Sequence, residues 1–265
     1  MRIADTFQGL RAKRRKALSL FVTAGYPALA DTVPLVLGLE KAGADLIELG
    51  IPFSDPIADG PTIQHSSEVA LKNGVTLHRT LGLARQIRAE SAIPLVLMGY
   101  ANPIWSYGLD RFLSEAAAIG IDGVIIADLP MEESGPYVSS ARKLGLATIF
   151  LAAPTTPAAR LAELDRVSTG FLYCISITGV TGERTSPSLR PEEFLAEARA
   201  SVKHNPLLVG FGISTPDDAR RIALLSDGII VGSALIKALG NSSGGNAGAA
   251  YALVGSMRKA LDDLG

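Results

Sequence analysis

Short apolar runs rich in β-branched residues recur along the chain, and longer stretches whose apolar residues have helical spacing separate them. Strictly alternating strands and helices indicate a parallel sheet, and eight such units in roughly 250 residues match the size of a closed (β/α)8 barrel. An open doubly wound sheet is the alternative, but no G-x-G-x-x-G motif follows the first run. The predicted strands cover residues 18–22, 45–49, 94–98, 123–127, 147–151, 170–175, 207–210 and 228–231.

A helix is predicted before the first strand, because Ile3, Phe7 and Leu10 recur at helical spacing. With this extra N-terminal helix, we expect residues 1–265 to form a single-domain TIM barrel, although the length alone also allows two domains. The glycine- and serine-rich residues 240–248 lie between two helical patterns. We interpret them as a flexible surface loop rather than a domain boundary.

Charge and cysteine content narrow the functional classes. The chain has 25 basic and 26 acidic residues, and its formal net charge of -1 gives no reason to expect binding to nucleic acid or to an anionic membrane. No run approaches the ~20 apolar residues of a membrane span. The basic residues at 11–16 and the apolar run behind them imitate a secretory signal, but residues 25–27 interrupt the pattern. Cys174 is the single cysteine, which predicts a protein without disulfide bonds in a reducing cytoplasm.

One carboxylate lies inside a predicted strand. Alternation places Glu48 on the opposite face from Ile47 and Leu49, so packing these two residues against helices directs Glu48 toward the inner side of the sheet. Burying a carboxylate costs roughly several kcal/mol unless it is neutralised or hydrogen-bonded. Glu48 is therefore a candidate for chemistry, with a hydrogen-bonded structural residue as the alternative. Tyr173, in the sixth predicted strand, is expected either to enter the barrel near Glu48 or to pack in the core.

Further carboxylates follow two of the predicted strands. Asp55 and Asp59 lie in the proline-containing loop after the second strand, and Asp128 follows the fourth. No lysine ends any predicted strand, which disfavours Schiff-base chemistry and leaves proton transfer by carboxylates as the favoured chemistry. The three histidines have no metal-ligand spacing, so we expect no catalytic metal.

Three glycine-bearing segments, at 178–182, 210–214 and 232–234, come directly after the sixth, seventh and eighth predicted strands. Glycines let backbone N–H groups approach an anion, and the helices that follow direct their positive ends toward it. Thr215 is predicted to cap the helix after the seventh strand. Because phosphate sites after strands seven and eight recur in barrels of this kind, the sequence predicts a phosphate site here.

Residues 48–64 read Glu-Leu-Gly-Ile-Pro-Phe-Ser-Asp-Pro-Ile-Ala-Asp-Gly-Pro-Thr-Ile-Gln and closely resemble the signature of the tryptophan synthase alpha chain family. The segments at 21–27, 98–103, 128–134, 179–182 and 210–214 also resemble that family, in the family's order. The resemblance therefore covers essentially the whole chain. The chain departs from the family in the glycine- and serine-rich segment after Gly240 and in the composition of residues 183–187.

The resemblance implies an activity and a partner. The family cleaves indole-3-glycerol phosphate to indole and glyceraldehyde 3-phosphate by a retro-aldol step, and it passes the indole to a beta chain. The implied assembly is an alpha2-beta2 tetramer. Pyridoxal phosphate is expected in the beta chain, and no cofactor is expected in this chain.

The resemblance also implies roles for individual residues. Glu48 matches the acid and base, Asp59 matches the second carboxylate, and Asp55 and Pro56 match residues at the docking surface for the beta chain. The remaining matches form an apolar wall for the indole ring and a phosphate site. They are Phe21, Ile63, Met98, Ile125 and Tyr173 in the wall, and Thr181, Gly182, Phe211, Gly212, Gly232 and Ser233 in the phosphate site.

Two alternative functions stay open. The first is a free-standing indole-3-glycerol phosphate lyase that releases indole without a beta chain. The second is a non-catalytic barrel that binds a phosphosugar and regulates a partner, although the presence of both Glu48 and Asp59 disfavours it. Indole release measured with and without a beta chain distinguishes the three functions.

Overall fold

The strands of the computed structural model form one parallel sheet. The structure describes residues 2–175, 191–210, 212–240 and 247–265, and within them the sheet has nine strands in the order β5-β4-β3-β2-β1-β9-β8-β7-β6. Thr181, Gly182, Phe211 and most of segment 240–248 lie outside the described residues. The strands are β1 (Ala17–Thr23), β2 (Leu46–Gly50), β3 (Leu95–Gly99), β4 (Gly123–Ile126), β5 (Ala147–Ile149), β6 (Leu151–Ala152), β7 (Leu172–Ile175), β8 (Leu207–Gly210) and β9 (Gly228–Val231).

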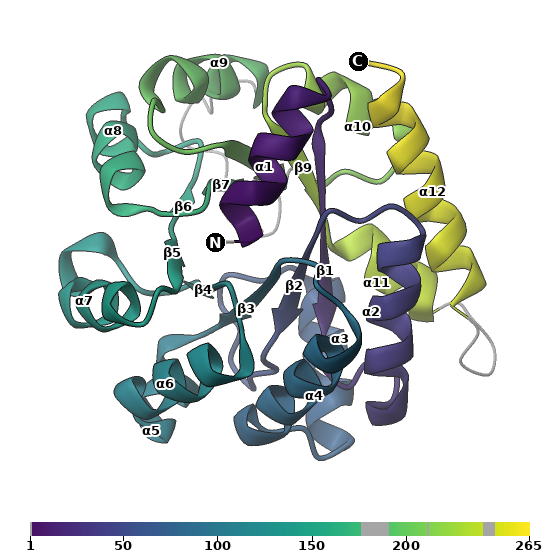
Figure 1. Cartoon of the computed structure of the whole chain (residues 1–265), viewed down its shortest axis with the longest axis vertical. Helices are drawn as coiled ribbons and strands as arrows, with labels where there is room; N and C mark the ends of the chain where they lie inside the picture. The colour runs from purple at the N-terminus through teal and green to yellow at the C-terminus, as the bar shows by residue number, and fades with distance from the viewer. Residues whose placement is uncertain (1, 176–190, 211, 241–246) are drawn as a thin grey trace.

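The fifth predicted strand closes the barrel. It appears as β5 and β6, which are separated only by Phe150; β5 pairs with β4, and β6 pairs with β7. The backbone of this segment also accepts hydrogen bonds across the closure, from Thr169 N to Thr148 O (2.8 Å) and from Tyr173 N to Phe150 O (3.1 Å). The two ends of the sheet are thus one interrupted strand, and the predicted (β/α)8 barrel is confirmed (Figure 1).

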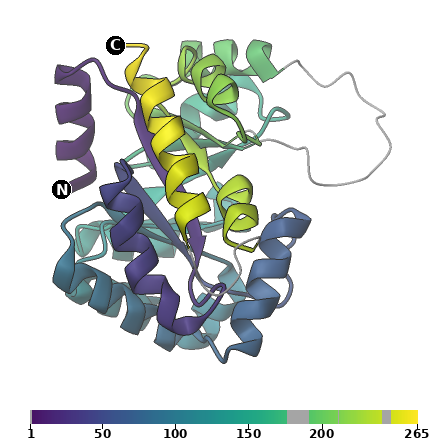
Figure 2. The same cartoon turned by 90° about the vertical axis from the view of Figure 1, so that its right-hand side faces the viewer.

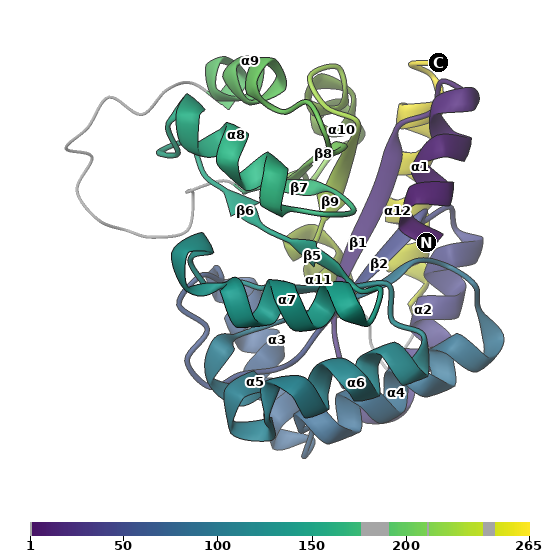
Figure 3. The same ribbon diagram turned by 60° about the vertical axis from the view of Figure 1, so that its left-hand side comes forward.

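The helices form a ring around the sheet, except α1, which lies at one end of the barrel (Figure 1). Figure 3 shows α4, α6 and α7 side by side on the outside of the sheet, and Figure 2 shows α12 beside α2 and α11. The helices are α1 (Arg2–Ala12), α2 (Thr32–Lys41), α3 (Pro61–Lys72), α4 (Leu77–Glu90), α5 (Ala101–Tyr107), α6 (Leu109–Ile119), α7 (Gly135–Lys143), α8 (Ala158–Val167), α9 (Pro191–Ser201), α10 (Pro216–Ala223), α11 (Ser233–Gly240) and α12 (Gly248–Asp262), with 3-10 turns η1 (Leu29–Asp31) and η2 (Met131–Glu133).

The apolar residues form two clusters, as alternation along each strand requires. The larger cluster lies between the sheet and the surrounding helices, and it includes Cys174, which is fully buried. The smaller one fills the inside of the barrel with side chains from the strands and from α1. Phe7 of α1 packs there with its ring centroid 6.4 Å from that of Phe171. No helix in the described part of the chain is both long and apolar enough to cross a membrane.

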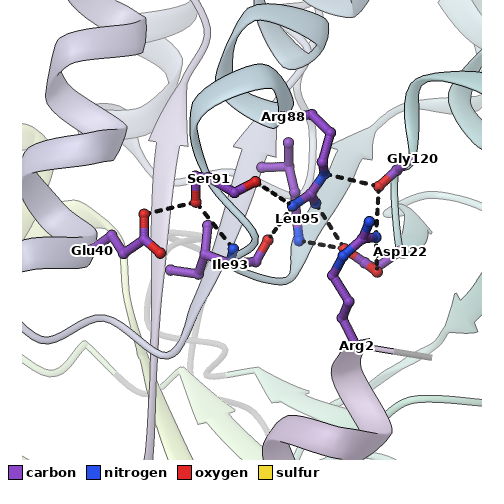
Figure 4. A network of polar contacts seen from close by, with 8 residues as sticks. All are labelled: Arg2, Glu40, Arg88, Ser91, Ile93, Leu95, Gly120 and Asp122. Atoms are coloured by element: carbon purple, nitrogen blue, oxygen red, sulfur yellow. Dashed lines mark hydrogen bonds and ion pairs between the residues drawn. The ribbon is translucent and has the colours of Figure 1, made fainter.

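The N-terminal helix is fastened to the amino-terminal end of the barrel by a buried carboxylate. Asp122 directly precedes β4 and is 5% exposed. Its carboxylate accepts hydrogen bonds from Arg2, Arg88 and the backbone N–H of Leu95, each at 2.9 Å (Figure 4). Arg88 and Arg2 also donate to the carbonyl oxygen of Gly120. We call these groups the Asp122 network. α1 therefore closes the end of the barrel opposite the carboxyl ends of the strands.

Candidate active site

Glu48 is completely buried inside the barrel. Strand alternation directs it inward from β2, where it pairs in register with Phe21 of β1 and Val96 of β3. Its Oε1 accepts a hydrogen bond of 2.7 Å from the Ser19 hydroxyl. Its Oε2 is also buried and has no hydrogen-bond partner among the described residues. The predicted inward orientation is confirmed, and the carboxyl group is held through one of its two oxygens.

The surroundings of Glu48 keep its proton exchangeable near neutral pH. Burial disfavours the charged form and raises the pKa of Glu48 from 4.5 to about 7, while the hydrogen bond from Ser19 acts in the opposite direction. No arginine or lysine of the described residues forms an ion pair with it. A carboxyl group with this pKa can both donate and accept a proton at physiological pH.

Asp59 lies in the loop between β2 and α3. The Tyr100 hydroxyl donates to Asp59 Oδ2 at 2.9 Å, and it accepts a hydrogen bond from the backbone N–H of Ala58 at 3.1 Å. The ring of Phe53 lies 5.4 Å from that of Tyr100, measured between centroids. Tyr100 therefore fastens the loop at three points. Burial raises the pKa of Asp59 to about 6, and the hydrogen bond from Tyr100 opposes this effect.

Tyr173 connects the two carboxylates electrostatically. It lies on β7, on the inner face of the barrel, with its ring 6.5 Å from that of Phe171. Burial raises the pKa of the Tyr173 hydroxyl, and the negative charges of Glu48 and Asp59 raise it further. The influence of both charges on this hydroxyl indicates that Glu48 and Asp59 lie on the side of the barrel that Tyr173 faces. The interpretation that Tyr173 enters the barrel near Glu48 agrees with this arrangement.

Four of the five residues of the predicted apolar wall face the inside of the barrel. Ile125 belongs to the inner cluster, Met98 and Tyr173 pack against it, and Phe21 lies on the same face of β1 as Ser19 and pairs in register with Glu48. Ile63 lies on α3 and belongs to the cluster between sheet and helices. The ring of Phe21 lies over β2. A Cβ atom added to Gly50 would lie 2.5 Å from Phe21 Cζ, so Gly50 allows the ring to cover β2.

The phosphate segments after β8 and β9 are described only in part. Gly212 has φ +56°, a conformation that favours glycine, and Gly232 directly precedes α11. Ser233 is the first residue of α11. Thr215 caps α10 as predicted: its hydroxyl accepts from Asp218 N at 3.1 Å, and its backbone N–H donates to the Asp218 carboxylate at 3.0 Å. Thr181, Gly182 and Phe211 lie outside the described residues, so the phosphate site stays a prediction.

The tip of the β2–α3 loop is exposed. Asp55 is exposed and accepts a hydrogen bond from the Ser54 hydroxyl, Pro56 is half-buried, and the apolar side chain of Ile57 is 76% exposed. A depression of about 650 Å³ lies beside this tip, and its lining includes Pro56 and His65. The tip is therefore available to a macromolecular partner.

Asp128 has a local structural contact. Its Oδ1 accepts a hydrogen bond of 2.7 Å from the backbone N–H of Ala101, at the first turn of α5. Asp128, one of the four carboxylates considered from the sequence, therefore stabilises the start of α5. Within the described ranges, no group of three or more histidine, cysteine, aspartate or glutamate side chains could hold a metal ion.

Sequence reasoning missed two residues of the site, Ser19 and Tyr100. Ser19 is a polar residue within the apolar run of the first strand, on the same face as Phe21, and this position is a usable signal. Tyr100 follows the third strand directly, at the end where active sites of such barrels lie. Neither pattern indicates which carboxylate the hydroxyl contacts, because that depends on pairing between strands and on loop conformation.

Comparison with known proteins shows which family the chain resembles. A family model described as Tryptophan synthase alpha chain matches residues 7–262. A tryptophan synthase alpha chain of Geotalea uraniireducens is 50% identical over 236 residues, which are 89% of this chain and 88% of the relative. One of Geobacter sulfurreducens is 46% identical over 261 residues, which are 98% of each chain. The crystal structure of tryptophan synthase subunit alpha from Legionella pneumophila superimposes with a TM-score of 0.90 at 41% identity, covering 99% of this chain and 98% of that one.

Proposed function

Since this chain belongs to the tryptophan synthase alpha chain family, we propose that it is a lyase that cleaves indole-3-glycerol phosphate to indole and glyceraldehyde 3-phosphate, with Glu48 and Asp59 as its catalytic residues. One observation carries the residue assignment. Glu48 on β2 is fully buried and Asp59 in the loop after it is half-buried, neither has a cationic partner among the described residues, and their pKa values are raised to about 7 and about 6. Such values suit proton transfer and charge stabilisation at neutral pH.

The reaction begins with Glu48 in its neutral form. Glu48 donates its proton to C3 of the indole ring, and the ring becomes a cation that accepts an electron pair. The bond between C3 and the glycerol carbon then breaks, and its electrons restore the aromatic ring. The adjacent glycerol hydroxyl becomes the aldehyde by losing its proton to the Glu48 carboxylate, so Glu48 returns to its starting state. One carboxyl group with a pKa near neutrality suffices for both transfers.

Asp59 acts in its ionised form. Positive charge develops on the indole nitrogen when C3 is protonated, and a carboxylate that accepts a hydrogen bond from the indole N–H stabilises that charge. The hydrogen bond from Tyr100 favours the ionised form of Asp59 and holds its loop. Active enzyme therefore combines a neutral Glu48 with an ionised Asp59. Because their pKa values lie at about 7 and about 6, both conditions are met best between those values.

Substrate binding uses apolar surfaces and backbone N–H groups. The indole ring packs against Met98, Ile125 and Tyr173 of the inner cluster, with Phe21 and Ile63 completing the wall. The phosphate group binds at the start of α11 and beside Gly212, with Thr181, Gly182 and Phe211 contributing from their segments. Gly212 supports this assignment, because its positive φ lets backbone N–H groups turn toward an anion.

The partner is a beta chain that holds pyridoxal phosphate and uses the indole, in an alpha2-beta2 assembly. It docks on the tip of the β2–α3 loop at Asp55 and Pro56, where Ile57 supplies an exposed apolar anchor. Because the same loop carries Asp59, a partner that orders the tip increases the fraction of molecules with Asp59 in place. Asp55→Ala should reduce activation by the partner and leave the basal rate of the isolated chain unchanged.

The decisive experiment measures indole release from indole-3-glycerol phosphate by the purified chain, alone and with a beta chain. Asp59→Asn should lose turnover while keeping the melting temperature, since a loop carboxylate contributes little to packing. Brisk turnover without any response to a beta chain supports the free-standing lyase. Phosphate-ligand binding without turnover supports the regulatory barrel.

A further inference from the structure

We propose that Ser19 is a positioning residue for the reaction, which holds the Glu48 carboxyl group so that Oε2 is the oxygen that exchanges the proton. This inference rests on the proposed function. Ser19 lies on β1, next to β2, and is completely buried. Its Oγ is 2.7 Å from Glu48 Oε1, a normal length for a hydroxyl donating to a carboxylate.

The contact makes the two carboxyl oxygens of Glu48 unequal. A serine hydroxyl has one hydrogen, so it can satisfy only one oxygen. In the described part of the chain, this is the one hydrogen bond of the Ser19 side chain, and Glu48 Oε2 has none. Oε1 is therefore held by the protein, whereas Oε2 is available to the substrate.

Ser19 can keep this hydrogen bond throughout the reaction. It donates to the carboxylate when Glu48 is ionised, and to the carbonyl oxygen of the carboxyl group when Glu48 is neutral. In the neutral form the proton consequently resides on Oε2, which donates it to C3 of the indole ring and later accepts the proton of the glycerol hydroxyl. Ser19 neither gains nor loses a proton, so it acts through Glu48 and not on the substrate.

The other groups around Glu48 do not replace Ser19. Tyr173 lies on the inner face of β7, where the charges of Glu48 and Asp59 raise the pKa of its hydroxyl, and Asp59 is bonded to Tyr100. Ionised Asp59 has no hydrogen to donate, so it cannot take the place of Ser19 as a donor. Within the described ranges, Ser19 is the hydrogen-bond donor that favours the ionised form of Glu48. Removing its hydroxyl should move the titration of Glu48 to higher pH.

The test combines a titration with kinetics for Ser19→Ala. The titration of Glu48 is followed by infrared difference spectroscopy of its carboxyl group, identified by the band that Glu48→Gln lacks. We expect Glu48 to titrate at higher pH, the alkaline limb of kcat/KM to move in the same direction, and kcat to fall about tenfold, the scale of one hydrogen bond to a charged group. KM should change little, because Ser19 does not contact the substrate.

Two further variants separate positioning from packing. Ser226→Ala is the matched control, since Ser226 is also buried and its hydroxyl lies within hydrogen-bond distance of the carbonyl oxygens of Ile222 and Gly228, away from Glu48. It should lower stability without moving the titration or the pH profile. Ser19→Thr keeps the hydroxyl and should restore the wild-type titration of Glu48 and the wild-type pH profile. If Ser19→Ala does not fold, Ser19→Cys, with a weaker donor of similar size, should show the same shift.

Two results would overturn the proposal. The first is a Glu48 titration that Ser19→Ala leaves in place. The second is a shifted titration with unchanged kcat and pH profile, which would make the hydrogen bond purely structural. Failure of the proposed function looks different, because Glu48→Gln itself would then release indole at the normal rate.

Discussion

Glu48 and Asp122 are both buried carboxylates of one barrel, yet they have different partners. Asp122, at the amino-terminal end, accepts hydrogen bonds from two guanidinium groups and one backbone N–H. Glu48, inside the barrel, accepts one hydrogen bond from a hydroxyl, and its second oxygen has no partner among the described residues. Full pairing fixes charge and geometry, whereas incomplete pairing leaves a proton exchangeable. A carboxylate thus holds the N-terminal helix at one end of the barrel, and a second carboxylate, by our proposal, serves catalysis inside it.

The largest effect is expected from replacing Asp122, the carboxylate with three hydrogen-bond donors. Asp122→Ala leaves Arg88 buried without its ion partner, because the Arg88 side chain is only 10% exposed. Losing one member of a buried pair costs about 3–5 kcal/mol. We expect the free energy of unfolding to fall by about that amount in urea titrations, with near-normal kcat for the folded fraction. Asp110→Ala, at an exposed carboxylate, is the control. Equal stability of the two variants would remove the distinction between the carboxylates.

The incompletely paired carboxylate, Glu48, should make the stability of the chain depend on pH. The folded-state pKa of Glu48, about 7, lies above its ordinary value of 4.5, so the folded chain binds more protons between those values. Its contribution is present at low pH and is lost as the pH rises from 4.5 through about 7, by about 3 kcal/mol. Unfolding free energies of wild type and Glu48→Gln, measured across this range, should therefore diverge, with the variant favoured at high pH. Parallel curves would contradict the raised pKa.

The same variant tests the catalytic role. Glu48→Gln keeps the size of the side chain and can still accept a hydrogen bond from Ser19, but it cannot exchange a proton. We expect kcat for indole release to fall about 10²-fold, the scale of general acid and base catalysis, while substrate binding survives. Glu90→Gln, at an exposed position on α4, should have normal kcat. Normal turnover by Glu48→Gln would exclude Glu48 from the mechanism.

A smaller effect is expected at the second carboxylate. Tyr100→Phe removes the hydrogen bond to Asp59, which favours its ionised form, so the pKa of Asp59 should rise above about 6. Because the reaction needs ionised Asp59, the acid limb of kcat/KM should move to higher pH, with about a tenfold loss on the acid side. The control is Tyr107→Phe, which removes a half-buried hydroxyl bonded to Glu115. An acid limb unchanged by Tyr100→Phe would show that Tyr100 only fastens the loop.

The barrel and the direction of Glu48 could be predicted from the sequence because both follow from alternation. The apolar runs predicted eight strands, and the period of two in residues 45–49 placed Glu48 inside the barrel. The same reasoning did not predict the interruption at Phe150 between β5 and β6. That interruption arises where the sheet closes, and closure depends on strands far apart in the sequence.

The hydroxyl groups beside the carboxylates could not be predicted for a related reason. The Ser19 contact with Glu48 crosses between neighbouring strands, and the Tyr100 contact with Asp59 joins the end of β3 to a loop 41 residues earlier. A linear pattern identifies which residue types are unusual in a strand. It does not indicate which of several hydroxyls comes within 3 Å of a given oxygen, because this depends on register and loop conformation.

Cys174 offers a practical consequence for following the partner. It is the single cysteine of the chain, it is fully buried in β7, and burial raises the pKa of its thiol to about 12. Maleimides and similar reagents attack the thiolate, so the folded chain should remain unlabelled. A cysteine introduced at Glu68, an exposed residue that lines the depression beside the loop tip, would consequently carry a fluorophore at one known position. Its emission could then report docking at the loop tip directly, on the same timescale as indole release.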